Sequence, residues 1–321
     1  MLAAYATGFS HEDPLSCLEL GDRPAPEAPA DWATVDVKAA SLNHHDLWSL
    51  RGVGLAQERL PMILGCDAAG LDEDGNEVVV HAVIGSEDWR GDETLDPRRS
   101  LLSERHQGTF AESVVVPRRN LVPKAPDLSF AEAACLPTAG LTAYRKLFTR
   151  GEVVPGMTVL VQGAAGGVAT ALTVLGSAAG ARVWVTSRSE EKRAQALELG
   201  ADAAFESGAR LPERVDVVME TVGKATWGHS VRACKPGGRI VVSGATSGED
   251  PSAELTRLFF LQLSVVGSTM GSRDELERLQ QLCVTRAIRP QIDRTLPLES
   301  AHDGFAQMLA GELLGKIVFE L

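Results

Sequence analysis

The sequence predicts an α/β fold in which a β-rich part is joined to a doubly wound parallel sheet. From residue 158 onward, short apolar runs alternate with helical periods, which is typical of repeated βαβ units. Before residue 120, short alternating runs such as 34–39 and 77–83 are broken by proline and glycine, which indicates a mainly β region. Because 321 residues exceed one ordinary domain, we expect two domains.

Glycines and apolar periods divide the second part into elements. An Ala-rich helical period ends at Gly180 and the next at Gly200, because a glycine just past the last helical residue closes many helices. The turn 235–238, with the sequence KPGG, leads the chain into another strand. The predicted elements are strand 158–162, helix 168–179, strand 182–186, helix 190–199, strands 215–220, 239–243 and 263–267, helix 274–286, strand 292–296, helix 299–309 and strand 316–320.

Composition excludes several classes of protein. The formal net charge of -12 repels polyanions, so we expect no nucleic-acid partner and no anionic-membrane partner. The five cysteines form no CxxC pair, which disfavours a disulfide framework and favours a reducing compartment. The chain has no signal-peptide pattern and no apolar run of about 18 residues. We therefore expect a cytoplasmic protein without a membrane span.

A glycine-rich turn at 162–169, with the sequence QGAAGGVA, separates a predicted strand from a predicted helix. Bare backbone there lets a pyrophosphate approach the amide groups at the helix N-terminus, next to Gly166, Gly167 and Val168. Alanines replace the outer glycines of the GxGxxG pattern, although alanine is tolerated at its third position. The alternative is a tight turn that binds nothing.

The second strand of this region predicts which nicotinamide cofactor is used. An NAD enzyme usually places an acidic residue there, about 20 residues past the glycines, to hold the ribose hydroxyls. Here the strand ends in Ser187 and Arg188, and Lys192 follows one helical turn later. A hydroxyl and two cations suit the 2′-phosphate of NADPH. The alternative is that both cations are ordinary surface charges.

Seven segments add a family resemblance, in their order along the chain: 41–48 (SLNHHDLW), 60–61 (LP), 65–70 (GCDAAG), 108–112 (GTFAE), 138–144 (TAGLTAY), the glycine turn and 315–318 (GKIV). This set, which runs through nearly the whole chain, resembles the medium-chain dehydrogenase/reductase superfamily, and most closely its zinc-independent quinone oxidoreductase branch. The resemblance implies a GroES-like catalytic domain made from residues 1–124 and 268–321, around a Rossmann NADP(H)-binding domain at 125–267.

The same resemblance implies that a metal site has been lost. Zinc-dependent members hold their catalytic metal at the positions of Asn43, Cys66 and Thr138, and an amide, a thiol and a hydroxyl do not make a normal tetrahedral zinc site. The four-cysteine lobe that binds a structural zinc is also missing. His44 and His45 could join Cys66 in another site, but adjacent side chains on an extended segment face opposite ways. We expect no bound metal.

Chemistry without a Lewis acid favours a particular acceptor. Zinc stabilises the alkoxide of an alcohol dehydrogenase, whereas a quinone or enone delocalises the incoming charge itself. The resemblance puts Asn43 beside the nicotinamide and substrate, gives Asp46 the task of orienting that segment, and makes Trp48 a pocket wall, with a core position as the alternative. His45 could donate the proton that follows the hydride, although solvent could do so equally.

The predicted activity is therefore hydride transfer from NADPH to a quinone or enone. The alternatives are an enoyl-thioester or 2-alkenal reductase of the same fold and a non-catalytic NADPH-binding sensor. A homodimer is expected, because the edge strand 263–267 could pair with its copy. Further cofactor contacts are Thr221 and Val222, which follow a strand end, and, by resemblance, Thr142, Ser243, Gly244, Ala245, Ser268, Thr269, Met270 and Lys316.

Overall fold

A computed structural model describes all residues, 1–321, and divides them into two compact units. The first contains 1–141 and 270–321, and the second contains 142–269. The first boundary thus falls later than the position after residue 124 that the sequence suggested. Hydrogen bonds explain this shift, because Ala134 O accepts from Ser41 Oγ at 3.0 Å and Ala125 N donates to Gln280 Oε1 at 2.9 Å.

The first unit is built on a seven-stranded sheet. Across the sheet the order is β10 (Leu121–Pro123), β6 (Glu77–Val80), β5 (Asp67–Asp72), β3 (Trp32–Ser41), β18 (Lys316–Glu320) and β17 (Ile292–Pro297), with β9 (Ser113–Pro117) paired to β3. Smaller sheets contain β2 (Leu18–Asp22), β1 (Leu2–Ala6) and β4 (Met62–Ile63), and β7 (Val83–Ile84) with β8 (Ser100–Leu101). The helices are α1 (His44–Leu50), α2 (Phe130–Ala134), α8 (Arg273–Thr285) and α9 (Ala301–Ala310).

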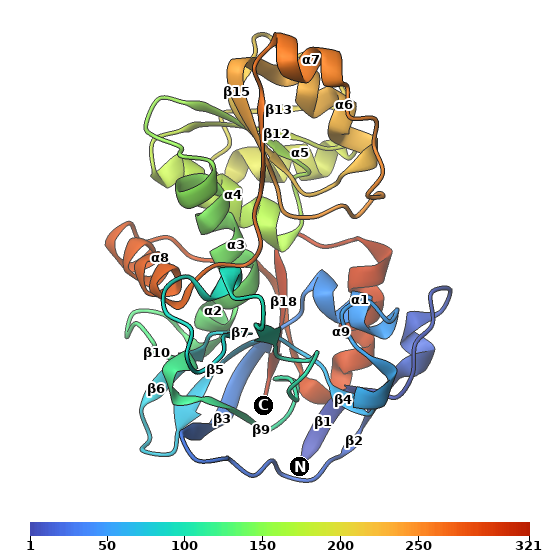
Figure 1. The fold of residues 1–321 in the computed structure, drawn as a ribbon, viewed down its shortest axis with the longest axis vertical. Coiled ribbons are helices and arrows are strands. Elements are labelled where there is room, and N and C mark those ends of the chain that lie inside the picture. Colours follow the sequence, from blue (N-terminus) through green and yellow to red (C-terminus); the bar gives the residue numbers. More distant parts are fainter. The chain divides into compact units, whose positions relative to one another are not determined.

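Strand pairing in this sheet brings three distant segments together. Ser41 lies opposite Asp67 of β5 on one side and Val318 of β18 on the other. Figure 1 shows the last strand, β18, running beside β3, the third strand of the chain. Phe319 of β18 packs edge-on against Phe110, with ring centroids 5.2 Å apart. The apolar core therefore fixes the ends of β3, β5 and β18, where several polar side chains are buried.

The second unit is a six-stranded parallel sheet in the order 3-2-1-4-5-6 typical of a doubly wound fold. Its strands are β13 (Ala203–Phe205), β12 (Arg182–Thr186), β11 (Thr158–Gln162), β14 (Val215–Glu220), β15 (Cys234–Val242) and β16 (Ser264–Gly267). Its helices are α4 (Gly167–Ala178), α5 (Glu190–Glu198), α6 (Lys224–Ala233) and α7 (Leu255–Phe260), and α3 (Leu141–Tyr144) precedes them. The strand order reverses between β11 and β14, where ligands of such sheets bind.

The predicted fold class is confirmed, and strands 158–162, 182–186, 215–220 and 316–320 have the predicted bounds. The segment after Asn43 was predicted to be extended, and this was wrong, because α1 begins at His44. Helices α6 and α7 and two π-helical stretches, Leu136–Gly140 and Arg145–Arg150, were not predicted. None of the helices has both the length and the apolar character needed to cross a bilayer.

Candidate active site

Helix α1 begins with a side chain that holds two segments in place. Asp46 Oδ2 accepts a hydrogen bond from Asn43 N at 2.8 Å, and Oδ1 accepts one from Gly65 N at 3.1 Å. Asp46 is fully buried, so both bonds are shielded from water. A carboxylate in the first turn also interacts favourably with the helix dipole. Asp46 therefore orients the start of α1 against the segment that leads into β5.

A buried polar cluster joins β3, β5 and β18. Lys316 Nζ donates to Leu42 O at 2.7 Å and to Asn43 Oδ1 at 2.5 Å, and lies 3.4 Å from Asp67 Oδ2. Asn43 Nδ2 in turn donates to Asp67 Oδ2 at 2.8 Å and to Ser41 O at 3.2 Å. Asp67 is fully buried, and Lys316 is 4% exposed, so the ammonium compensates the buried carboxylate.

This cluster does not fit a metal at the positions that the resemblance implies. The ammonium of Lys316 already lies against the Asn43 side chain, and a metal cation there would be repelled by it. Thr138 offers only a hydroxyl, whose Oγ1 is buried without a hydrogen-bond partner. Such a neutral oxygen is a weak ligand compared with the thiolate, imidazole or carboxylate that zinc prefers. Asn43 and Thr138 therefore leave Cys66 as the single strong ligand of that set.

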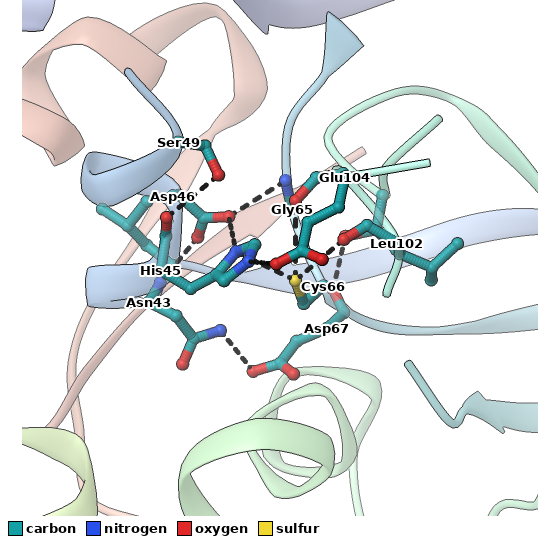
Figure 2. Close-up of polar contacts among 12 residues, drawn as sticks. Asn43, His45, Asp46, Ser49, Gly65, Cys66, Asp67, Leu102 and Glu104 are labelled. Atoms are coloured by element: carbon teal, nitrogen blue, oxygen red, sulfur yellow. Dashed lines mark hydrogen bonds and ion pairs between the residues drawn. The ribbon is translucent and has the colours of Figure 1, made fainter. Parts of the chain in front are cut away.

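His45 lies in a second cluster, which Figure 2 shows beside Asn43 and Asp67 of the first. Its Nδ1 is 3.3 Å from Cys66 Sγ, and its Nε2 is 3.0 Å from Glu104 Oε1. The Cys66 thiol also donates to Leu102 O at 3.3 Å. At the start of α1, His45 points at Cys66 whereas His44 is exposed, so only His45 belongs to this cluster.

Burial, the neighbouring thiol and two carboxylates shift the pKa values of the groups in this second cluster. Burial works to lower the pKa of His45, but Cys66, Asp46 and Glu104 outweigh it and raise that pKa well above its ordinary value. Burial also raises the pKa of the Cys66 thiol, although His45 opposes that shift. The thiol and the imidazole thus act on each other in opposite directions, because each favours the charged form of the other. Both ring nitrogens are already engaged.

The glycine turn of the second unit has the open backbone that the sequence suggested. Gly163 has φ of +92°, a left-handed conformation that favours glycine. Gly166 precedes α4, and a Cβ added there would meet no atom within 4 Å. Gly167 and Val168 form the first residues of α4, so their amides lack helical partners. This end of the helix is suited to an anion.

Two buried side chains that sequence reasoning missed hold the neighbouring strand end. Glu220 Oε1 accepts from Val222 N at 2.8 Å and Gly223 N at 3.0 Å, which fixes the turn after β14. Gln162 Nε2 donates to Ser230 Oγ at 2.9 Å and connects β11 with α6. Polar residues at the last position of two buried strands were the available signal. The turn that contains Thr221 and Val222 is therefore rigid.

The end of β12 carries the predicted 2′-phosphate residues. Ser187 is half-buried, Arg188 is exposed, and the Ser189 side chain caps α5 by accepting from Lys192 N at 3.2 Å. Arg193, which was not predicted, donates through Nη1 to Ser187 O at 2.7 Å. The loop between β12 and α5 is thus held in place by Arg193 of α5, and Arg188 is exposed at the tip of this loop.

The other predicted residues lie in separate places. In the second unit, Ser243 follows β15, Ser268 follows β16, and the buried hydroxyl of each lacks a partner. Trp48 is half-buried on α1. For Lys316, a contact with a cofactor phosphate would require its ammonium to leave the buried cluster. The remaining positions are Thr142, buried in α3; Gly244 and Ala245, after β15; Thr269, the last residue of the second unit; and Met270, the first of the returning segment.

Together, a GroES-like β unit and a doubly wound sheet with an open glycine turn define a two-domain oxidoreductase fold that uses a nicotinamide cofactor. The family model of the alcohol dehydrogenase GroES-like domain matches residues 29–127, and that of the zinc-binding dehydrogenase matches 167–285. The chain belongs to the medium-chain dehydrogenase/reductase superfamily. The superfamily resemblance is thereby confirmed, but the comparisons do not single out the quinone oxidoreductase branch.

Relatives that match nearly the whole chain include an alcohol dehydrogenase-like protein and an acryloyl-coenzyme A reductase. A zinc-type alcohol dehydrogenase-like protein of Schizosaccharomyces pombe is 30% identical over 89% of this chain and 90% of that protein. An acryloyl-coenzyme A reductase of Sulfurisphaera tokodaii is 29% identical over 94% of this chain and 95% of that protein. A crystal structure of an NAD-dependent alcohol dehydrogenase has 32% identity, a TM-score of 0.92 and full coverage of both chains.

Proposed function

We propose that this chain reduces the conjugated double bond of an enoyl thioester or related enone with hydride from NADPH. The observation that carries the proposal is the position of Lys316, whose ammonium lies against Asn43 where a metal-dependent relative would bind zinc. The acceptor must therefore delocalise the negative charge itself, and an α,β-unsaturated thioester does so over its carbonyl group. Similarity to an acryloyl-coenzyme A reductase supports this substrate class over simple alcohols.

The residues of the chain position the reactants in this reaction. NADPH supplies the hydride, which adds to the β-carbon of the acceptor, and a proton then adds to the α-carbon. Asp46 fixes the backbone that carries Asn43, which we place next to the nicotinamide, and the half-buried Trp48 forms part of the pocket wall. We assign the proton to solvent rather than to His45, because both nitrogens of that ring are engaged by Cys66 and Glu104.

The cofactor assignment rests on the end of β12. Arg188 is exposed at the tip of a loop that Arg193 braces, and no carboxylate stands at the end of the strand. A guanidinium binds a phosphate with two parallel hydrogen bonds, which the ribose hydroxyls of NADH do not offer. NADPH is therefore the preferred donor. The glycine turn and the turn held by Glu220 contribute the remaining contacts.

A panel of acceptors tests the activity. NADPH consumption is measured with crotonyl-CoA, a 2-alkenal, an enone, several quinones and, in reverse with NADP⁺, a series of primary and secondary alcohols. Turnover of the thioester or enone without alcohol oxidation supports the proposal. Turnover of quinones alone would restore the acceptor that the sequence first suggested. Tight NADPH binding without any turnover would make the protein a sensor, and alcohol oxidation alone would refute the proposal.

A homodimer through the second unit is part of the same proposal. Strand β16 is the last strand on its side of the sheet, so one edge of its backbone is unpaired. Next to it in sequence, α7 exposes Phe259 and Phe260, which are 70% and 78% accessible. Two copies related by a two-fold axis would pair these edges and cover this apolar surface.

A further inference from the structure

Three metal-ligand atoms meet beside the Lys316 cluster. His45 Nδ1, Cys66 Sγ and a carboxylate oxygen of Asp46 all lie within 4.8 Å of one another. The imidazole nitrogen is 3.3 Å from the sulfur and 3.9 Å from Asp46 Oδ1. Bond lengths of about 2.3 Å for Zn–S and about 2.0 Å for Zn–N place the same two ligands of a tetrahedral ion about 3.5 Å apart. The imidazole and thiol are thus already spaced for one ion.

The surroundings of these atoms are those of a metal site as well. Glu104 Oε1 lies 3.0 Å from His45 Nε2, so the second ring nitrogen can donate to a carboxylate while Nδ1 faces the sulfur. Metal-binding histidines almost always have such a carboxylate or carbonyl partner, which fixes the tautomer and the ring orientation. In Figure 2, Glu104 and Cys66 approach the imidazole ring of His45, Glu104 from the turn after β8 and Cys66 from the bend just before β5.

We propose that His45, Cys66 and Asp46 bind a zinc-like divalent cation, with Glu104 holding the imidazole from outside. A nitrogen, a sulfur and a carboxylate oxygen form a donor set typical of zinc, and water can complete the tetrahedron. The ion would bind the thiolate of Cys66 and the unprotonated Nδ1 of His45, and any protons on these two atoms would pass to solvent. Cys66 is 1% exposed and Asp46 is fully buried, while the 19% exposure of the His45 side chain leaves an entry path.

This site differs from the one that zinc-dependent relatives use. It takes two ligands from the first turn of α1 and does not involve Asn43 or Thr138, so the Lys316 ammonium remains in its own cluster. The sequence led us to expect no metal because Asn43, Cys66 and Thr138 do not make a zinc site and because His44 and His45 were expected to face opposite ways on an extended segment. In the helix, the neighbours His45 and Asp46 both lie near Cys66. The proposed hydride transfer does not depend on this ion, so the two proposals can be tested separately.

Cobalt(II) is the probe for the test, because a thiolate bound to Co²⁺ gives a charge-transfer band in the near ultraviolet. The full-length protein is treated with a chelator, freed of it, and titrated with Co²⁺ alone and then with Zn²⁺. We expect one equivalent of Co²⁺ to produce the band and Zn²⁺ to abolish it. Cys66→Ser should remove the band, whereas the control Cys17→Ser, at a half-buried thiol outside the cluster, should keep it.

Glu104→Gln is a second test variant. It does not replace a fully buried side chain, because the Glu104 side chain is 23% exposed. This variant should unfold in one cooperative thermal transition, as a folded protein does, and should bind Co²⁺ about 10- to 100-fold more weakly than the unaltered protein. Absence of the band in the unaltered protein, its persistence in Cys66→Ser, or unchanged affinity in Glu104→Gln would each overturn the site. Protein that binds Co²⁺ but turns over no acceptor refutes only the proposed function, and active protein without the band refutes only the site.

Discussion

At the scale of single residues, the sequence motifs identified the positions where zinc ligands are replaced. They did not identify the side chains that contact these positions. Asn43, Cys66 and Thr138 can be recognised from local sequence alone. Lys316 and Glu104 lie far from them along the chain, and only the pairing of β18 with β3 and the loop after β8 bring these residues to the site. Contacts between distant segments leave no local pattern, so a single sequence could not predict the two clusters.

Arg188 is the residue on which cofactor preference depends most directly. Arg188→Ala should raise the KM for NADPH on the order of tenfold, about 1.4 kcal/mol, while the KM for NADH stays the same. Steady-state kinetics with both cofactors measure this. Arg214→Ala is the matched control, because Arg214 is an exposed arginine just before the amino end of β14, whereas Arg188 follows the carboxyl end of β12 in the same parallel sheet. An equal rise in the KM for both cofactors would show that Arg188 does not bind the 2′-phosphate.

Lys146 is a buried cation in the second unit, and its Nζ donates to Glu220 O at 2.9 Å. Burial lowers the pKa of Lys146 from 10.5 to about 7, although Glu220 opposes the shift. Between these two pH values the unfolded chain binds more protons than the folded protein, so the free energy of unfolding rises with pH across that range. The cost of burying Lys146 is therefore largest below the lower value and falls as pH rises.

Replacing this amine with an apolar side chain should stabilise the protein in acid. At pH of about 6, Lys146→Met should raise the free energy of unfolding on the order of 1–4 kcal/mol, since a well-packed apolar group replaces a buried charge. At alkaline pH the two proteins should become more similar. Urea unfolding at both pH values checks this. A Lys146→Met protein that is less stable by the same amount at both would contradict the assignment.

At the scale of elements, predictions succeeded where one period ran uninterrupted. Buried runs such as 158–162 and 182–186 lie inside a parallel sheet, where both faces are apolar and glycines mark the ends. Helix α1 was missed because its seven residues are too short for an apolar period to be evident, and its start depends on the Asp46 side chain. The π-helical stretch Leu136–Gly140 contains Pro137 and Gly140, which argue locally against a helix.

Strand β16 carries the prediction about assembly. Val265 is 47% exposed on this strand, and a lysine there should prevent two edges from pairing. Val265→Lys should therefore run as a monomer in size-exclusion chromatography with light scattering, while the unaltered protein runs as a dimer. Leu197→Lys, at a 46% exposed leucine of α5, which packs against β13 at the other edge of the sheet, should leave the dimer intact. A monomeric unaltered protein, or a dimeric Val265→Lys, would contradict the edge-pairing model.

At the scale of the whole molecule, one unit offers an open glycine turn and an exposed arginine, and the other offers a buried cluster in which an ammonium is fixed. The first set of features suits a phosphorylated dinucleotide, and the second leaves charge stabilisation to the acceptor. Superfamily membership establishes the fold and the use of a nicotinamide cofactor, but not the acceptor, because one fold hosts many reactions. The acceptor group is identified by finding which carbon atom receives the hydride.

The most direct test uses NADPH that carries deuterium at the transferred position, with crotonyl-CoA as the acceptor and mass spectrometry of the product. If the chain reduces a conjugated double bond, the deuterium will be found on the β-carbon of a saturated thioester, and the carbonyl group will be intact. Deuterium on a carbon that bears a hydroxyl group would show that the carbonyl had been reduced instead. That result would contradict hydride transfer to a conjugated double bond.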